Sequence, residues 1–286
     1  MKIAAYTVND AERIGIVTEA GIVDITRRFG VYRVRDLLAR DLLGRVQDME
    51  SAATEFDVAD VTFLPVVPDP RHIYCIGINY SDHLKEVQAA GVPRPLPEYP
   101  SVFIRFADTL VAHNAPMLLP KVSDSFDYEA ELAVIIGKGG RFIDERHALE
   151  HVAGYACFND GSVRDWQFHT TQVTPGKNFA ATGGFGPFMV TADAIPDPHS
   201  LDVKLMLNGQ VLQSGNTRDL IFSIPRIVSY LSTFLPLHPG DVIATGTPAG
   251  VGFSRKPPLF MKPGDVCEVE VEKVGALRNP IMRDRS

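Results

Sequence analysis

The sequence has few cysteines, no long apolar run and no excess of basic residues, and each scarcity excludes a class of protein. Its three cysteines, Cys75, Cys157 and Cys267, are far apart and odd in number, so they form neither a disulfide framework nor the spacing of a zinc site. We expect them to be buried small side chains. No apolar run approaches about 18 residues, so we expect no membrane span. The formal charge of −7 and the isoelectric point near 5.6 argue against a nucleic-acid partner.

The composition is that of an ordinary globular protein, with 45% hydrophobic and 22% charged residues among 286. The chain starts in a strand-like pattern and not in a secretory signal, so we expect a cytoplasmic protein. Short strand patterns and one helical pattern predict a small N-terminal α/β domain over residues 1–64. A proline-rich connector follows, and the main domain is predicted over residues 65–286.

Hydrophobic periodicity and turn signals predict the elements of both domains. An Asn-Gly pair at 208–209 is the strongest hairpin signal. The predicted strands are 3–7, 14–18, 21–24, 72–77, 132–136, 154–158, 203–207, 242–245 and 266–271, and the predicted helices are 34–43, 82–90, 142–152 and 216–234, the last capped by Asn216 and kinked at Pro225.

Two glutamates, Glu129 and Glu131, stand at the start of an aliphatic strand pattern. Side chains two apart in a strand share a face, so both carboxylates can reach one ion. Carboxylates at the mouth of an apolar strand repel each other and are poorly solvated unless a cation neutralises them. The alternative is that the two glutamates are solvent-side residues of an edge strand.

Further polar residues occur at positions where ligands and bases are often found. His83 and Glu86 share a face of a predicted helix, although such a pair can be an incidental surface contact. Asp160 ends an apolar strand before a glycine turn, which suits either a ligand or a simple turn aspartate. Lys177 lies among glycine and other small residues.

Five motifs, in this order, resemble the fumarylacetoacetate hydrolase family, specifically its members with a small N-terminal domain. They are residues 77–83, 128–132, 159–165, 176–179 and 240–248, and the resemblance covers about residues 70 to 275. It implies an α+β, β-rich fold in which the main domain is a mixed β-sandwich roll. It also implies a homodimer that binds Mg²⁺, with Mn²⁺ or Ca²⁺ as possible substitutes.

The resemblance also implies roles for individual residues. Lys177 would be the cationic partner of the substrate, and His83 with Glu86 would form a general-base pair on a mobile lid helix. Asp82 corresponds to a further aspartate near the metal of the family's namesake, but we do not expect it to be a direct ligand here. The metal ligands would be Glu129, Glu131 and Asp160, and the substrate contacts Arg164, Gln167 and Thr247. Arg164 could instead form a structural ion pair.

Three carboxylates form an all-oxygen site that suits a hard divalent ion and leaves positions for a chelating 2-oxo acid. Such a site can stabilise an enolate at the keto oxygen. We therefore expect a hydrolase that cleaves an acylpyruvate-like 2,4-dioxo acid into pyruvate and a carboxylic acid, via a metal-stabilised enolate. His83 would take the proton from the attacking water. The alternatives are an isomerase or decarboxylase of unsaturated 2-oxo dicarboxylates in aromatic catabolism, and a non-catalytic binding protein.

Overall fold

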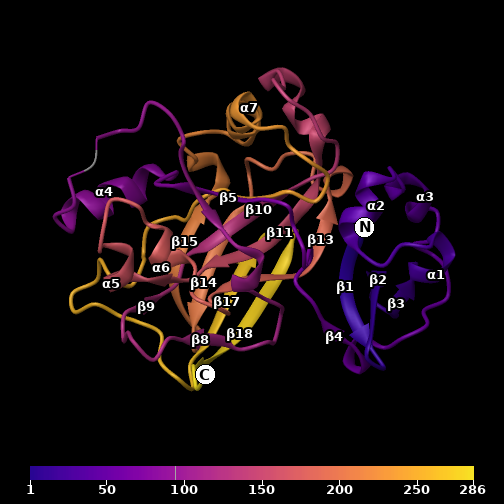
Figure 1. The fold of residues 1–286 in the computed structure, drawn as a ribbon, viewed down its shortest axis with the longest axis horizontal. Coiled ribbons are helices and arrows are strands. Elements are labelled where there is room, and N and C mark those ends of the chain that lie inside the picture. The colour runs from indigo at the N-terminus through magenta and orange to yellow at the C-terminus, as the bar shows by residue number, and fades with distance from the viewer. Residues whose placement is uncertain (94) are drawn as a thin grey trace.

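The computed structural model describes residues 1–93 and 95–286, and two packed sheets dominate it (Figure 1). The strands are β1 (Lys2–Val8), β2 (Ala11–Thr18), β3 (Gly21–Asp24), β4 (Thr62–Phe63), β5 (Ile73–Gly77), β6 (Ser101–Arg105), β7 (Leu110–Val111), β8 (Met117–Leu119), β9 (Phe126–Asp127), β10 (Ala130–Ile136), β11 (Val152–Asp160), β12 (Ser162–Val163), β13 (Gly183–Thr191), β14 (Asp202–Leu207), β15 (Gln210–Asn216), β16 (Val242–Ala244), β17 (Val266–Val271) and β18 (Gly275–Arg283). The α-helices are α1 (Thr26–Phe29), α2 (Val34–Ala39), α3 (Leu43–Gln47), α4 (Ser81–Ala89), α5 (Arg164–Gln167), α6 (Thr174–Lys177) and α7 (Ile224–Phe234).

The larger sheet has 11 strands and runs β3-β2-β1-β13-β11-β10-β16-β5-β6, with β4 and β7 paired off this path. The smaller sheet has five strands in the order β15-β14-β17-β18-β8. Strands β10, β11 and β13 contact β14, β17 and β18, so the two sheets lie face to face. Most pairs are antiparallel, whereas β16–β5, β13–β7 and β18–β8 are parallel. The predicted α+β, β-rich class with mixed sheets is confirmed.

Strand β10 is buried on both faces, which explains its unbroken aliphatic sequence. Leu132 and Val134 belong to the core between the two sheets. Ala133 and Ile135 face the other way, into a core that includes Ile3 of the N-terminal segment. The N-terminal elements therefore cover the second face of the central strands.

The N-terminal strands continue the larger sheet. Lys2 and Ile3 of β1 pair with Val190 and Met189 of β13. Figure 1 shows β1–β4 and α1–α3 grouped at one side of the ribbon, next to β13. The predicted boundary between residues 1–64 and 65–286 falls between β4 and β5, and the division into two domains stays a prediction.

Three of the predicted helices differ from the structure. Residues 34–43 form α2 and the start of α3, separated by Asp41 with a φ of 51°. The helix expected over 142–152 is a 3₁₀ helix, η3 (Glu145–His151), because Phe142 has a φ of 54° and the chain turns helical only after Asp144.

The helix expected over 216–234 begins later. Asn216 caps a 3₁₀ turn, η5 (Thr217–Asp219), and does not cap the main helix. Ser223 caps α7 by accepting a hydrogen bond from the Arg226 N–H. Pro225 consequently lies in the first turn, where a missing N–H is tolerated, and produces no kink.

The cysteines are buried and unbonded, as predicted. Burial raises the pKa of Cys157 to about 12, so its thiol stays protonated and unreactive at neutral pH.

Within the described residues, none of the helices has the length and apolar content needed to traverse a bilayer. The remaining described elements are three 3₁₀ turns, η1 (Val58–Asp60), η2 (Ala107–Thr109) and η4 (Ala192–Ala194).

Candidate active site

Three carboxylates converge at one end of the two central strands. Glu129 directly precedes β10, Glu131 is its second residue, and Asp160 ends β11. The ladder pairs Ala130 with Asn159, which places Glu129 and Asp160 on facing chains, and the Asp160 N–H donates to the Glu129 carbonyl at 2.9 Å. One oxygen from each carboxylate lies within 4.8 Å of the others. The structure therefore brings together the three residues predicted as metal ligands.

The two glutamates are not on an edge strand. Strand β10 lies between β11 and β16, and Glu129 and Glu131 are 6% and 2% exposed. The alternative of solvent-side residues on an edge strand is therefore wrong. Burying these carboxylates would be costly without positive partners.

Three buried cations supply much of that compensation. The Lys177 Nζ lies 2.7 Å from Glu129 Oε2 and 2.5 Å from Asp160 Oδ2. Arg164 Nη2 is 2.7 Å from Glu129 Oε1, on the opposite side of that carboxylate. Arg105 Nη1 is 2.6 Å from Asp160 Oδ1. Each cation thus holds a specific oxygen in place.

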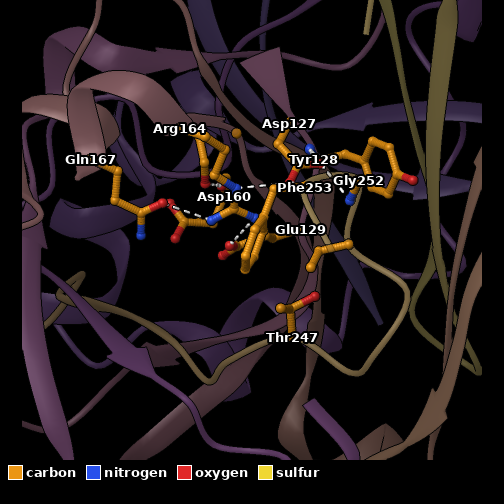
Figure 2. Close-up of polar contacts among 12 residues, drawn as sticks. Asp127, Tyr128, Glu129, Asp160, Arg164, Gln167, Thr247, Gly252 and Phe253 are labelled. Atoms are coloured by element: carbon orange, nitrogen blue, oxygen red, sulfur yellow. Dashed lines mark hydrogen bonds and ion pairs between the residues drawn. The ribbon is translucent and has the colours of Figure 1, made fainter. Parts of the chain in front are cut away.

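Arg164 is fixed by three further groups. Its Nε donates to Asp127 Oδ2 at 2.7 Å, and its Nη1 donates to Gln167 Oε1 at 2.8 Å (Figure 2). Its guanidinium lies 4.7 Å from the ring centroid of Phe253. The expected alternative, a structural ion pair, is therefore present, and Arg164 also lines the cavity described below.

Glu131 differs electrostatically from its neighbours. Among the described residues it has no ion-pair partner, and its carboxylate accepts a hydrogen bond from the Gly246 N–H at 2.8 Å. Burial, together with the negative charges of Asp160 and Glu129, raises the pKa of Glu131 well above its ordinary value. Burial alone would also raise the pKa of Glu129, but Lys177 and Arg164 lower it to about 2. Glu131 is therefore the carboxyl group of the cluster that has no ion-pair partner among the described residues and that favours its protonated form.

The predicted histidine–glutamate pair is formed on α4. His83 Nδ1 lies 2.9 Å from Glu86 Oε2, and the His83 side chain is 6% exposed. Burial raises the pKa of Glu86, but hydrogen bonds from His83, Ser254 and the Gly250 N–H outweigh it and the pKa is lowered. An anionic Glu86 accepts the Nδ1 proton and leaves Nε2 of His83 as the free basic nitrogen.

A cavity of about 480 Å³ joins these groups. His83, Lys177 and Gln167 line it together with Thr247, so the predicted substrate contacts share one space with the base. Asp82 is exposed and its carboxylate accepts from the His83 N–H, outside the cluster. The cavity lining also includes Val87, Val102, Ile104, Glu129, Glu131, Arg164, Phe168 and Phe253.

Two buried residues of the site were not predicted. Arg105 ends the mostly apolar strand β6, and a single arginine in such a strand is the sequence feature that could have indicated a buried ion pair. Besides Asp160, it donates to the Gly161 carbonyl at 3.0 Å and to Thr182 Oγ1 at 2.8 Å. Asp127 accepts from Arg164 and from the Gly252 N–H, a contact between distant segments with no local signal.

The donor set fits a hard divalent ion. Three converging carboxylate oxygens, without sulfur or imidazole among them, suit Mg²⁺, Mn²⁺ or Ca²⁺ and disfavour zinc. Glu131 has no ion-pair partner among the described residues, and a bound cation would stabilise its ionised form. Glu129, Glu131 and Asp160 would hold the ion.

Known proteins resemble this chain along most of its length. The family model described as fumarylacetoacetate (FAA) hydrolase C-terminal matches residues 72–282. An oxaloacetate tautomerase of Homo sapiens, named as mitochondrial, is 42% identical over 226 residues, which are 78% of this chain and 70% of the relative.

Solved structures share the fold from end to end. A maleylpyruvate hydrolase from Sphingobium sp. SYK-6, in complex with manganese(II) ion and pyruvate, is 29% identical with a TM-score of 0.82 and covers 100% of both chains. A probable 2-hydroxyhepta-2,4-diene-1,7-dioate isomerase from Mycobacterium abscessus is 27% identical, also with a TM-score of 0.82 and 100% of both chains. These similar proteins thus carry names of several reaction types.

Glu131→Gln tests the assignment of Glu131 as a metal ligand. The change replaces a buried carboxyl group, which has no ion-pair partner among the described residues, by a neutral amide of similar shape, so the metal-free protein is expected to melt no lower than the wild type. Its affinity for Mg²⁺ should fall on the order of 100-fold, because one of three anionic ligands is lost. Calorimetric titration and melting curves with and without Mg²⁺ measure both effects, and Asp82→Asn is the matched control. A Glu131→Gln protein that Mg²⁺ still stabilises as much as the wild type would contradict the ligand assignment.

The raised pKa of Glu131 predicts that metal binding releases a proton. A carboxyl group that is protonated without the ion must lose its proton to bind it, so Mg²⁺ affinity should rise with pH until the raised pKa of Glu131 is passed and level off above it. Titration calorimetry in two buffers of different ionisation enthalpy measures the released proton. Equal binding heats in both buffers, with affinity independent of pH, would refute this electrostatic description.

Proposed function

The chain belongs to the fumarylacetoacetate hydrolase family, and on that premise we propose that it is a divalent-metal-dependent hydrolase that cleaves an acylpyruvate-like 2,4-dioxo acid to pyruvate and a carboxylic acid. The observation that carries the proposal is that His83, paired with Glu86, lines the same cavity as Glu129 and Glu131 of the carboxylate cluster. A base that faces a hard-cation site can activate water beside a bound 2-oxo acid.

The reaction needs one water and one base. His83 Nε2 takes a proton from the water, whose oxygen adds to the C4 carbonyl of the substrate. The C3–C4 bond then breaks, its electron pair moves onto C3 and the C2 keto oxygen as an enolate, and the acyl group leaves as the carboxylic acid. The His83 proton returns to C3 and completes pyruvate. A divalent ion, when bound, supplies Lewis-acid stabilisation of the negative charge on the keto oxygen.

Other residues orient the substrate and the carboxylates. Lys177 holds Glu129 and Asp160 and adds positive charge beside the reacting oxygen. Gln167 and Thr247 line the cavity and offer hydrogen bonds to the substrate. Gln213 donates to the Thr247 hydroxyl oxygen at 2.8 Å, so that the hydroxyl proton is free to point at a substrate oxygen.

Apolar side chains in the lining of the cavity suit an apolar acyl group. They are Val87, Val102, Ile104, Phe168 and Phe253. An alkyl or aryl substituent would displace water from these side chains, which favours binding. We propose acylpyruvates with such substituents as the substrates to test first.

Keto–enol tautomerisation of a 2-oxo diacid is the second candidate. It is favoured by the 42% identity to a protein named oxaloacetate tautomerase. The same His83 would take a proton from C3 and leave the C–C bonds intact. Mg²⁺ as the preferred ion, a homodimer and a cytoplasmic location stay predictions.

The decisive assay offers both kinds of substrate to the purified protein with Mg²⁺. Acetylpyruvate and benzoylpyruvate should yield pyruvate and the free acid in equal amounts, and reaction in H₂¹⁸O should place one labelled oxygen in the released acid. Oxaloacetate is followed by the absorbance of its enol and by CO₂ release. Tautomerisation of oxaloacetate without pyruvate from any acylpyruvate would overturn the hydrolase proposal in favour of the second candidate.

His83→Gln should lower kcat by about 1,000-fold while Mg²⁺ affinity stays within about twofold, because the base is lost and the ligands are untouched. The control is His147→Gln, since His147 forms the same i, i+3 pair with Glu150 on the exposed surface, at 2.8 Å. Calorimetry and steady-state kinetics measure both parameters. Full activity in His83→Gln would rule out this histidine as the base.

A further inference from the structure

The Glu86 carboxylate is held from two sides. Its Oε2 lies 2.9 Å from His83 Nδ1, and its Oε1 accepts from the Gly250 N–H at 2.9 Å and from the Ser254 hydroxyl at 2.6 Å. His83 and Glu86 belong to α4, whereas Gly250 and Ser254 belong to the loop after β16. Glu86 therefore connects the helix that carries the base to a separate loop.

The Ser254 hydroxyl has two acceptors for one proton. The Val251 carbonyl lies at 2.9 Å and Glu86 Oε1 at 2.6 Å. Hydrogen bonds to an anion are shorter and stronger than bonds to a neutral carbonyl, so the proton belongs to Glu86. With the Gly250 N–H, this contact fixes the rotation of the carboxylate and directs Oε2 at His83.

The loop is held in place by contacts that do not involve Ser254. Asp127 accepts from the N–H groups of Gly252 and Phe253 at 2.8 and 3.0 Å (Figure 2). Arg255 donates to the carbonyls of Leu212 and Gly250 at 2.6 and 3.0 Å. The loop thus presents Ser254 to Glu86 from a frame that should survive the loss of one hydroxyl.

We infer that Ser254 is a positioning residue for the reaction, acting through Glu86 on His83. Its hydroxyl fixes the carboxylate so that one imidazole tautomer, with the proton on Nδ1 and the lone pair on Nε2, faces the cavity. The inference rests on the proposed function, in which Nε2 of His83 is the base. Sequence spacing does not indicate this contact, because 168 residues separate Ser254 from Glu86.

Ser254→Ala in the full-length, Mg²⁺-loaded protein tests the inference. The kcat for acylpyruvate cleavage is expected to fall about tenfold, while KM and Mg²⁺ affinity stay within about twofold, because one charge-assisted hydrogen bond is lost. Ser254→Thr keeps the hydroxyl and should recover most of the loss. Ser214→Ala, on the exposed face of β15, is the matched control.

A spectroscopic readout separates this inference from the proposed function. In ¹⁵N-histidine-labelled protein, His83 should show a single tautomer protonated at Nδ1, assigned by comparison with His83→Gln. Ser254→Ala should show both tautomers, whether or not any substrate is turned over.

The possible results distinguish failure of the positioning role of Ser254 from failure of the proposed function. An unchanged tautomer and unchanged kcat in Ser254→Ala, beside an inactive His83→Gln, would overturn the positioning role and leave the proposed function standing. A rise in KM together with a fall in Mg²⁺ affinity and kcat would also overturn the positioning role, because that pattern would mark Ser254 as merely structural. If the wild type cleaves no 2-oxo acid but Ser254→Ala still shows both His83 tautomers, the hydrolase proposal is overturned and the positioning role of Ser254 stands.

Discussion

The structure of the site depends on the burial of like charges. Arg105, Arg164 and Lys177 stand against four buried carboxylates, those of Asp127, Glu129, Glu131 and Asp160. Buried carboxylates at this spacing are costly unless cations surround them. The three cations fix the positions of three carboxylates and leave Glu131 without an ion-pair partner among the described residues. That imbalance is the physical reason to expect a bound divalent ion.

The fold buries this cluster, which limits how far solvent can relieve the repulsion. The carboxylates sit at the ends of β10 and β11, in the middle of the larger sheet. The smaller sheet covers one face of these strands and the N-terminal elements cover the other. The N-terminal segment packs against the strands that carry the cluster, and none of its residues is among those that line the cavity.

The sequence predicted those parts of the fold and site that depend on local patterns. Glu129 and Glu131 converge at the start of β10, and His83 and Glu86 share a helix face, so short spacings were enough to pair them. The Asn208-Gly209 turn likewise joins β14 to β15 as predicted. Asp160 and Lys177 were assigned by resemblance to a family, and the structure brings them to the same cluster.

Long-range contacts were not predictable from the sequence in the same way. Arg105 reaches Asp160 across 55 residues, and Ser254 reaches Glu86 across 168, with no periodicity to relate them. Helix limits were also missed where backbone geometry decided them. Phe142 adopts a positive φ, and Leu220 departs from helical geometry after η5, so both predicted helices start late.

The most direct measurement is a crystal structure of the protein grown with Mn²⁺, with anomalous scattering recorded at the manganese edge. The account predicts one strong peak bonded to an oxygen of each of Glu129, Glu131 and Asp160, at roughly 2.0–2.3 Å. Lys177 should remain beside the carboxylates and the cavity side of the ion should be open. No peak at the cluster, or a manganese bound elsewhere while the cluster is closed by its three cations alone, would contradict it.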